Sequence, residues 1–165
     1  MDGYRIGGLK DRPIIFRMPR SLALVVIHVI FSTKDRLPLL NDDVRPDLFA
    51  YLATVARNAG CECYRAGGVA DHVHLAIRQG KEQTIAKLVE QLKTSSSRWL
   101  KTQGIPNFAW QIGYGAFSVG PADLEALLRY IDGQEAHHRK HSFRDELSAF
   151  LRKYGLDADD EHLWN

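Results

Sequence analysis

The alternation of apolar and polar positions is clearest in residues 71–77, which read Asp-His-Val-His-Leu-Ala-Ile. Successive side chains of an extended strand point to opposite faces of a sheet. His72 and His74 therefore share one face, and the valine, leucine and isoleucine between and after them share the other, where they can be buried. The pattern predicts a strand over 72–78 with a core on one side and room for a site on the other.

Three further strands are predicted. A run rich in Val and Ile indicates a buried central strand over 22–31, and residues 61–69 form a hairpin with the histidine strand. The aromatic segment 108–119 also has strand character. Gly113 and Gly115 within it indicate a bend or a close backbone approach.

Apolar residues at helical spacing predict the helices. The first begins at the N-cap Asn41 and ends at Gly60, and the second covers 82–103 with a basic outer face. A third helix opens at 120–123, and a short helical pattern runs through 143–151.

The third helix carries Tyr130, Gln134 and His137 along one ridge, at i, i+4 and i+7. Gly133 lies inside the same pattern and costs of order 1 kcal/mol relative to alanine in a helix. It therefore marks a flexible or closely approached point.

The order strand, helix, strand, strand, helix, strand predicts the α+β class, with a ferredoxin-like antiparallel sheet that has helices on one face. The other face is left free for a site, and an additional C-terminal helix follows. At 165 residues the chain fits one domain, for which we expect residues 18–165, after a weakly ordered N-terminal extension over 1–17.

Composition narrows the classes of function only a little. The chain is 45% hydrophobic and 25% charged, as expected for a globular protein, and its net charge of +2 permits a nucleic-acid partner without requiring one. Cys61 and Cys63 are poorly placed on one strand to bond to each other, so we expect reduced thiols in a reducing compartment. The longest apolar run, 22–31, is too short for a membrane helix.

Two neutral imidazoles side by side can bind one metal ion, and a metal can polarise a phosphate oxygen. The alternative is that His72 and His74 are partly exposed strand residues without a ligand.

The motif His72-Val73-His74 followed by Tyr130 to Gln134 resembles the single-tyrosine HUH transposases of small bacterial insertion sequences. This family includes the transposases associated with repetitive extragenic palindromes. The resemblance covers about residues 18–165, with further similar segments at 31–34, 113–119, 130–143 and 154–164.

The resemblance implies that His72 and His74 hold Mg²⁺ or Mn²⁺, with Gln134 as the third protein ligand. Tyr130 would be the catalytic nucleophile, which attacks single-stranded DNA beside a hairpin and forms a 5′-phosphotyrosine intermediate. Because these three ligands are neutral, we expect modest affinity for the bare ion. The resemblance also implies a homodimer, with active sites that can be shared between subunits, acting on nucleoid DNA in the cytoplasm of a bacterial or archaeal cell.

Basic and aromatic residues supply candidates for DNA contacts, although surface lysines are usually solvated and a tryptophan in an apolar pattern is more often a core residue. The predicted nucleic-acid-binding residues are Lys34, Arg36, Arg78, Lys93 and Arg98, with Arg65, Lys87 and Lys101 as further phosphate contacts and Trp99, Trp110 or Tyr114 as stacking residues.

The roles of the other polar residues near the predicted site have more than one interpretation. Asp71 either orients a neighbouring histidine or is a turn residue, and His28 is expected to be a satisfied strand histidine, although it can face the site. The remaining histidines are expected near DNA phosphate or solvent: His137, His138 and His141.

Two other functions compete with a transposase. One is a domesticated hairpin-binding nuclease or regulator without transposition, which differs in the DNA that flanks the gene. The other is a ferredoxin-like metal-binding or ligand-binding module without catalysis, in which Tyr130 is only a packed helix residue.

Overall fold

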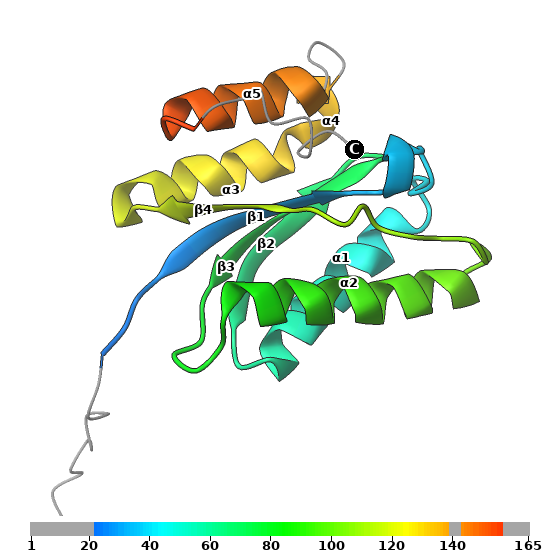
Figure 1. The fold of residues 1–165 in the computed structure, drawn as a ribbon, viewed down its shortest axis with the longest axis horizontal. Helices are drawn as coiled ribbons and strands as arrows, with labels where there is room; N and C mark the ends of the chain where they lie inside the picture. The colour runs from blue at the N-terminus through cyan, green and yellow to red at the C-terminus, as the bar shows by residue number, and fades with distance from the viewer. Residues whose placement is uncertain (1–21, 139–142, 157–165) are drawn as a thin grey trace, which may run out of the picture.

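Four antiparallel strands form the sheet in the order β2-β3-β1-β4 (Figure 1). This is the order of a ferredoxin-like sheet, so the α+β prediction is confirmed.

The structure is a computed structural model that describes residues 22–138 and 143–156, and the expected extension over 1–17 lies outside this part. The strands are β1 (Val26–Ser32), β2 (Glu62–Gly68), β3 (His72–Arg78) and β4 (Gly115–Val119). The helices are α1 (Arg45–Asn58), α2 (Ile85–Thr102), α3 (Leu124–Asp132), α4 (Gln134–His138) and α5 (Phe143–Lys153), with 3-10 turns η1 (Lys34–Arg36) and η2 (Pro121–Asp123).

The first face of the sheet packs against α1 and α2, which lie together below it in Figure 1. Val73, Leu75 and Ile77 of β3 are fully buried in this core, as their alternation predicts. Helix α2 begins where the Thr84 hydroxyl accepts a hydrogen bond from the Lys87 N–H at 3.2 Å. Burial of the apolar stripes of both helices against the β3 side chains is the main stabilising contribution to this layer.

The second face carries the histidines and is not left open. Helices α3, α4 and α5 lie on it, above the sheet in Figure 1. A small apolar cluster joins the sheet to α5 and consists of Ile30, Phe117, Leu147 and Leu151. The site expected on this face is therefore covered by a layer of helices.

Three predicted elements differ from the structure. Helix α1 begins at Arg45 with Val44 at its N-cap, and Asn41 instead accepts a hydrogen bond from the Val44 N–H before the helix.

The strand expected over 108–119 is regular only in β4, with one isolated bridge between Trp110 and Thr33 before it. Between this bridge and β4, the Gln111 N–H still donates to Ser32 O of β1, whereas the carbonyl groups of residues 111–113 accept hydrogen bonds from the Lys93 ammonium. The single helix expected from 120 onward is divided at Gly133, where α3 ends and α4 begins.

None of the helices in the described ranges is long and apolar enough to cross a membrane.

Helix α3 approaches the sheet closely at Gly67 of β2. A Cβ atom at this position would lie 2.7 Å from Ile131 Cγ2 and 2.9 Å from the Ile131 carbonyl oxygen. The second contact is with backbone, so a side-chain rotation cannot relieve it. Gly67 therefore sets how near the Tyr130-bearing helix lies to the histidines.

We expect Gly67→Ala to destabilise the protein by about 1–3 kcal/mol, because α3 must move away from the sheet. Urea unfolding followed by circular dichroism measures the change. Gly113→Ala is the matched control, since a Cβ there meets nothing within 4 Å. Equal stability of the two variants would contradict the close approach.

Candidate active site and metal centre

His72 and His74 project from β3 onto the covered face and are fully buried. His74 Nδ1 lies 3.0 Å from His28 Nε2 of the neighbouring strand β1. If His74 donates its Nδ1–H to His28, its Nε2 keeps a lone pair for a ligand. His28 is thus a satisfied strand histidine, as expected, and it also orients His74.

Asp71 has the corresponding role for the other histidine. Its carboxylate Oδ1 lies 2.7 Å from His72 Nδ1. Donation of the Nδ1–H to this carboxylate leaves His72 Nε2 directed into the site, the arrangement typical of metal-binding histidines. The structure therefore favours the orienting reading of Asp71 that the sequence left open.

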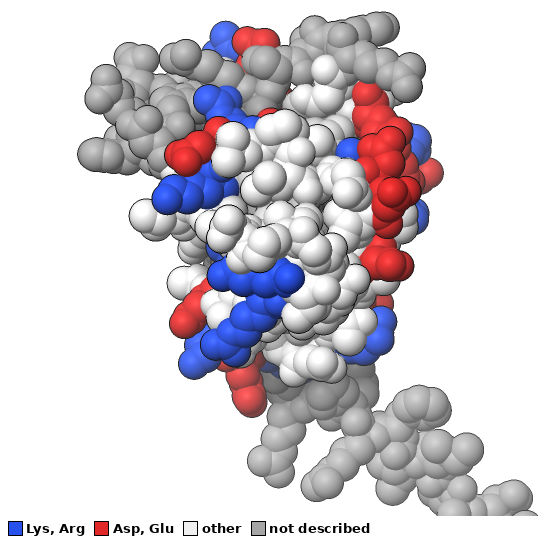
Figure 2. All heavy atoms as spheres, turned by 90° about the vertical axis from the view of Figure 1, so that its right-hand side faces the viewer, with Lys and Arg blue, Asp and Glu red and all other residues white. Residues whose placement is uncertain are grey.

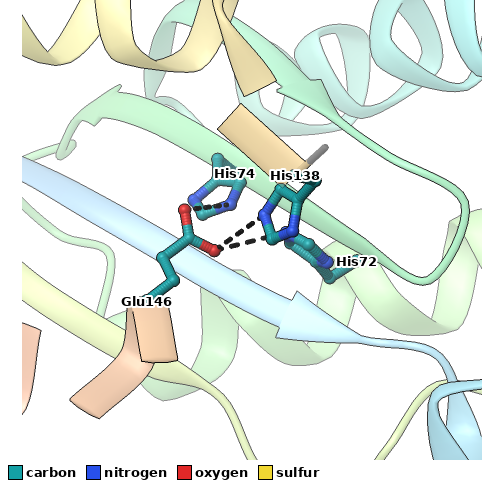
Figure 3. A group of neighbouring side chains, drawn as sticks. All are labelled: His72, His74, His138 and Glu146. Atoms are coloured by element: carbon teal, nitrogen blue, oxygen red, sulfur yellow. Dashed lines mark hydrogen bonds and ion pairs between the residues drawn. The ribbon is translucent and has the colours of Figure 1, made fainter. Parts of the chain in front are cut away.

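A carboxylate from α5 meets both imidazoles, and sequence reasoning missed it. Glu146 Oε2 lies 3.5 Å from His72 Nε2, and Glu146 Oε1 lies 3.7 Å from His74 Nε2. His138 of α4 completes the group, with its Nε2 3.1 Å from Glu146 Oε2 (Figure 3). The His138 side chain is not directed to solvent, as one expectation had it, because it is only 13% exposed and its ring centre lies 4.5 Å from that of His72. His141 and the His137 side chain lie outside the described part.

Gln134 also reaches this group, as its predicted role as a ligand requires. Its Nε2 donates to Glu146 Oε1 at 3.1 Å, and the residue is 1% exposed. Its Oε1 is buried without a hydrogen-bond partner among the described residues. A buried amide oxygen without a partner is costly unless a ligand binds it.

The donor set suits a divalent cation. The ligand atoms of His72, His74, His138 and Glu146 all lie within 4.8 Å of one another. The amide of Gln134 contacts this group through its Nε2, and its buried Oε1 is a further candidate donor. Imidazole nitrogens together with carboxylate and amide oxygens bind ions such as Mn²⁺. The negative charge of Glu146 raises the expected affinity above that of the neutral set inferred from the sequence.

Tyr130 of α3 packs beside the histidines of the same chain. Its ring centre lies 5.7 Å from that of His74 and 6.2 Å from that of His28, both edge to face. The hydroxyl oxygen is buried, and Phe150 of α5 covers the ring at 5.8 Å. One chain thus brings together the predicted nucleophile and the predicted ligands.

Burial and charge set the protonation of the site. Desolvation by burial, with a smaller contribution from the positive charge of Lys153, lowers the pKa of His28 to about 3, so this ring is neutral. Burial opposes the charged form of His72, but the hydrogen bond to Asp71 and the nearby carboxylates of Asp71 and Glu146 outweigh it and raise the pKa of that imidazole. The hydrogen bond from His72 in turn lowers the pKa of Asp71, against the effect of desolvation.

The predicted DNA-contact residues lie in different surroundings. Arg78 pairs with Glu62 at 3.2 Å, and Lys93 donates to three carbonyl groups of the loop before β4. Arg98 is exposed on α2, and Lys34 and Arg36 are exposed in η1. In the face shown by Figure 2 the basic side chains form separate groups, and acidic side chains gather along one margin.

The predicted stacking residues differ in how far their rings are exposed. Trp99 stacks on Tyr51, with ring centres 5.1 Å apart, and Trp110 is 9% exposed with its indole N–H donating to Ser96. Tyr114 is 41% exposed. Tyr114 is therefore the most exposed of the three aromatic residues.

Both cysteines are free thiols, as expected, with Cys61 buried and Cys63 half-buried. Burial raises the pKa of Cys63 to about 11, with smaller opposing contributions from a hydrogen bond and nearby arginines. A thiol in this state is a poor nucleophile, which agrees with a structural role.

We expect Glu146→Gln to weaken Mn²⁺ binding by about tenfold or more, because the substitution removes the negative charge from the donor set. Isothermal titration calorimetry without DNA measures the affinity. Glu125→Gln is the matched control, since this carboxylate pairs with Arg129 on the exposed side of α3. Unchanged affinity in Glu146→Gln would exclude Glu146 as a ligand.

Comparison with known proteins agrees with this geometry. The family model described as "Transposase IS200 like" matches residues 21–134. The match contains His72, His74 and Tyr130 and ends at Gln134, so Glu146 and α5 lie beyond it. No curated protein matches the chain.

Two solved structures share the fold. A crystal structure from Deinococcus radiodurans R1, provisionally described as a transposase, is 24% identical, with a TM-score of 0.57 over 70% of this chain and 95% of the other. A REP-associated tyrosine transposase bound to a REP hairpin is 15% identical, with a TM-score of 0.54 over 84% of this chain and 74% of the other. The match to the family model confirms the resemblance found in the sequence: this chain belongs to the IS200-like transposase family.

Proposed function

We propose that this transposase cleaves and rejoins single-stranded DNA beside a hairpin, with Tyr130 as its nucleophile. The observation that carries the proposal is the placement of the Tyr130 ring against His74, at 5.7 Å, in the same buried site as Gln134 and Glu146. A bond forms between the phenolic oxygen and the phosphorus while the bond from phosphorus to the 3′-oxygen breaks. The phenol loses its proton, and the 3′-oxygen leaves as a hydroxyl group after gaining one.

The side chains around Tyr130 prepare this step. His28 and Asp71 hold the two β3 imidazoles so that each directs its Nε2 into the site. A divalent ion, Mg²⁺ or Mn²⁺, held by His72, His74 and Gln134 would stabilise the negative charge on the attacked phosphate. Storing the phosphodiester energy in the tyrosine ester makes rejoining possible without ATP.

Hairpin DNA is the proposed substrate. The support is the fold shared with a tyrosine transposase whose structure contains a REP hairpin. Hairpins display a single-stranded flank, and the proposed chemistry needs an accessible unpaired phosphate. A hairpin with an unpaired 5′ flank is therefore the appropriate test substrate.

Entry of DNA requires movement at α5. Glu146 is 5% exposed and occupies the space among the imidazoles, and Phe150 covers Tyr130. A phosphate and the Glu146 carboxylate are both anionic, so they compete for the same partners. We therefore expect DNA binding to displace at least the Glu146 end of α5.

Tyr130→Phe should abolish covalent protein–DNA adducts, because the ring remains but the attacking oxygen is lost. Labelled hairpin oligonucleotides are incubated with Mn²⁺ and separated on denaturing gels. Tyr51→Phe is the control, since that ring stacks on Trp99 on the opposite face of the sheet. An adduct that persists in Tyr130→Phe would assign the nucleophile to another residue.

We also propose that each active site is completed within one chain, including in the homodimer that the family resemblance implies. Mixing Tyr130→Phe protein with His74→Ala protein should then restore no adduct, because neither chain holds an intact tyrosine and histidine pair. The same gel assay measures the result. Recovery of adduct to about a quarter of the wild-type amount or more, as random subunit mixing allows, would instead require sites shared between subunits.

A further inference from the structure

One lysine binds three successive carbonyl groups of the loop before β4, next to the Gln111 N–H that donates to Ser32 O of β1. Lys93 of α2 directs its Nζ to the carbonyl oxygens of Gln111, Ile112 and Gly113, at 2.6, 3.0 and 2.6 Å. An ammonium group has three hydrogens to donate, so these acceptors match its full capacity. Charge-assisted hydrogen bonds of this kind hold the loop against α2.

The fixed loop presents apolar side chains to solvent. Ile112 is 96% exposed and Tyr114 is 41% exposed. Neither contributes to the buried core of the described chain. An isolated exposed apolar residue is common, but two on a loop held by its own lysine form a surface suited to a partner.

A groove of about 590 Å³ runs between this loop and α2. Arg98 and Lys101 line it and are exposed, one turn apart on the same side of the helix. Trp110 lines its inner part, where its indole N–H is bound to Ser96. The acidic residue of the lining is Glu90, so basic groups outnumber acidic ones along the groove.

A second hollow, of about 500 Å³, adjoins the first. Both hollows include Tyr114 in their lining, and the second extends to Leu147 and Leu151 of α5. Leu147 directly follows Glu146 in the chain. The two hollows therefore mark a route from the basic side of α2, past Tyr114, to the helix that covers the active site.

We propose that this route binds the unpaired strand of the DNA, with Arg98 and Lys101 on its phosphates and Tyr114 and Ile112 against its bases. The inference rests on the proposed function, because it identifies the path by which single-stranded substrate reaches Tyr130. Basic groups beside accessible aromatic surface fit a single strand, whose phosphates and base faces are both available. A duplex offers its phosphates but keeps its base faces stacked.

The test uses Tyr130→Phe protein, so that binding is measured without cleavage. Fluorescence anisotropy records the affinity for a labelled unpaired oligonucleotide and its dependence on salt. The variants are the double substitution Arg98→Gln with Lys101→Gln, and Tyr114→Ala. The matched control is Arg57→Gln with Lys81→Gln, which removes the same charge from exposed positions outside the groove.

We expect the double variant to bind about tenfold more weakly and its salt slope to fall by about 1.4, or about 0.7 for each lost phosphate contact. Tyr114→Ala should also lose about tenfold in affinity, from lost stacking. The control should change the affinity and the salt slope much less. Thermal unfolding of each variant verifies that it is folded.

Three results would overturn the proposal. In the first, the double variant at Arg98 and Lys101 binds the oligonucleotide as tightly as the control does. In the second, Tyr114→Ala keeps the wild-type affinity. In the third, a duplex of equal length binds as tightly as the single strand. Failure of the proposed function is a separate result, seen as the absence of adduct with Tyr130 intact while the groove variants still weaken binding.

Discussion

Two buried imidazoles, those of His72 and His74, are the constraint on which the rest of the site depends. A ring nitrogen removed from water needs a hydrogen-bond partner or a ligand, and each imidazole has two ring nitrogens. Asp71 and His28 satisfy the nitrogens that point away from the centre. The other two point to one location, where Glu146 meets them. Tautomer, ring orientation and ligand geometry are thus set by the same hydrogen bonds.

The layer of helices above the sheet follows from this constraint. Buried histidines require a cover that brings polar partners, and α3, α4 and α5 supply Tyr130, Gln134 and Glu146. The missing side chain at Gly67 lets α3 lie close enough for the tyrosine ring to contact His74. The same closeness leaves His72 and His74 with no exposed surface.

The loop before β4 illustrates how one ionic group binds the backbone at the edge of a sheet. The carbonyl groups of residues 111–113 accept hydrogen bonds from Lys93, while the Gln111 N–H still donates to Ser32 O of β1. The Lys93 ammonium is therefore already hydrogen-bonded to the backbone. Unlike the exposed Arg98, it is not a free contact for DNA. A lysine on a basic helix face thus has a structural role here.

The sequence by itself determined the ferredoxin-like order of elements and the faces of β3, because strand alternation and helical spacing are local properties of the chain. The family motifs also identified His72, His74, Tyr130 and Gln134 as residues that meet. Only the tertiary structure placed Glu146 among them, since a glutamate in an amphipathic helix has no local pattern that distinguishes a ligand from a solvated charge. The partners of buried polar groups come from segments far apart in sequence, and packing alone decides which of them meet.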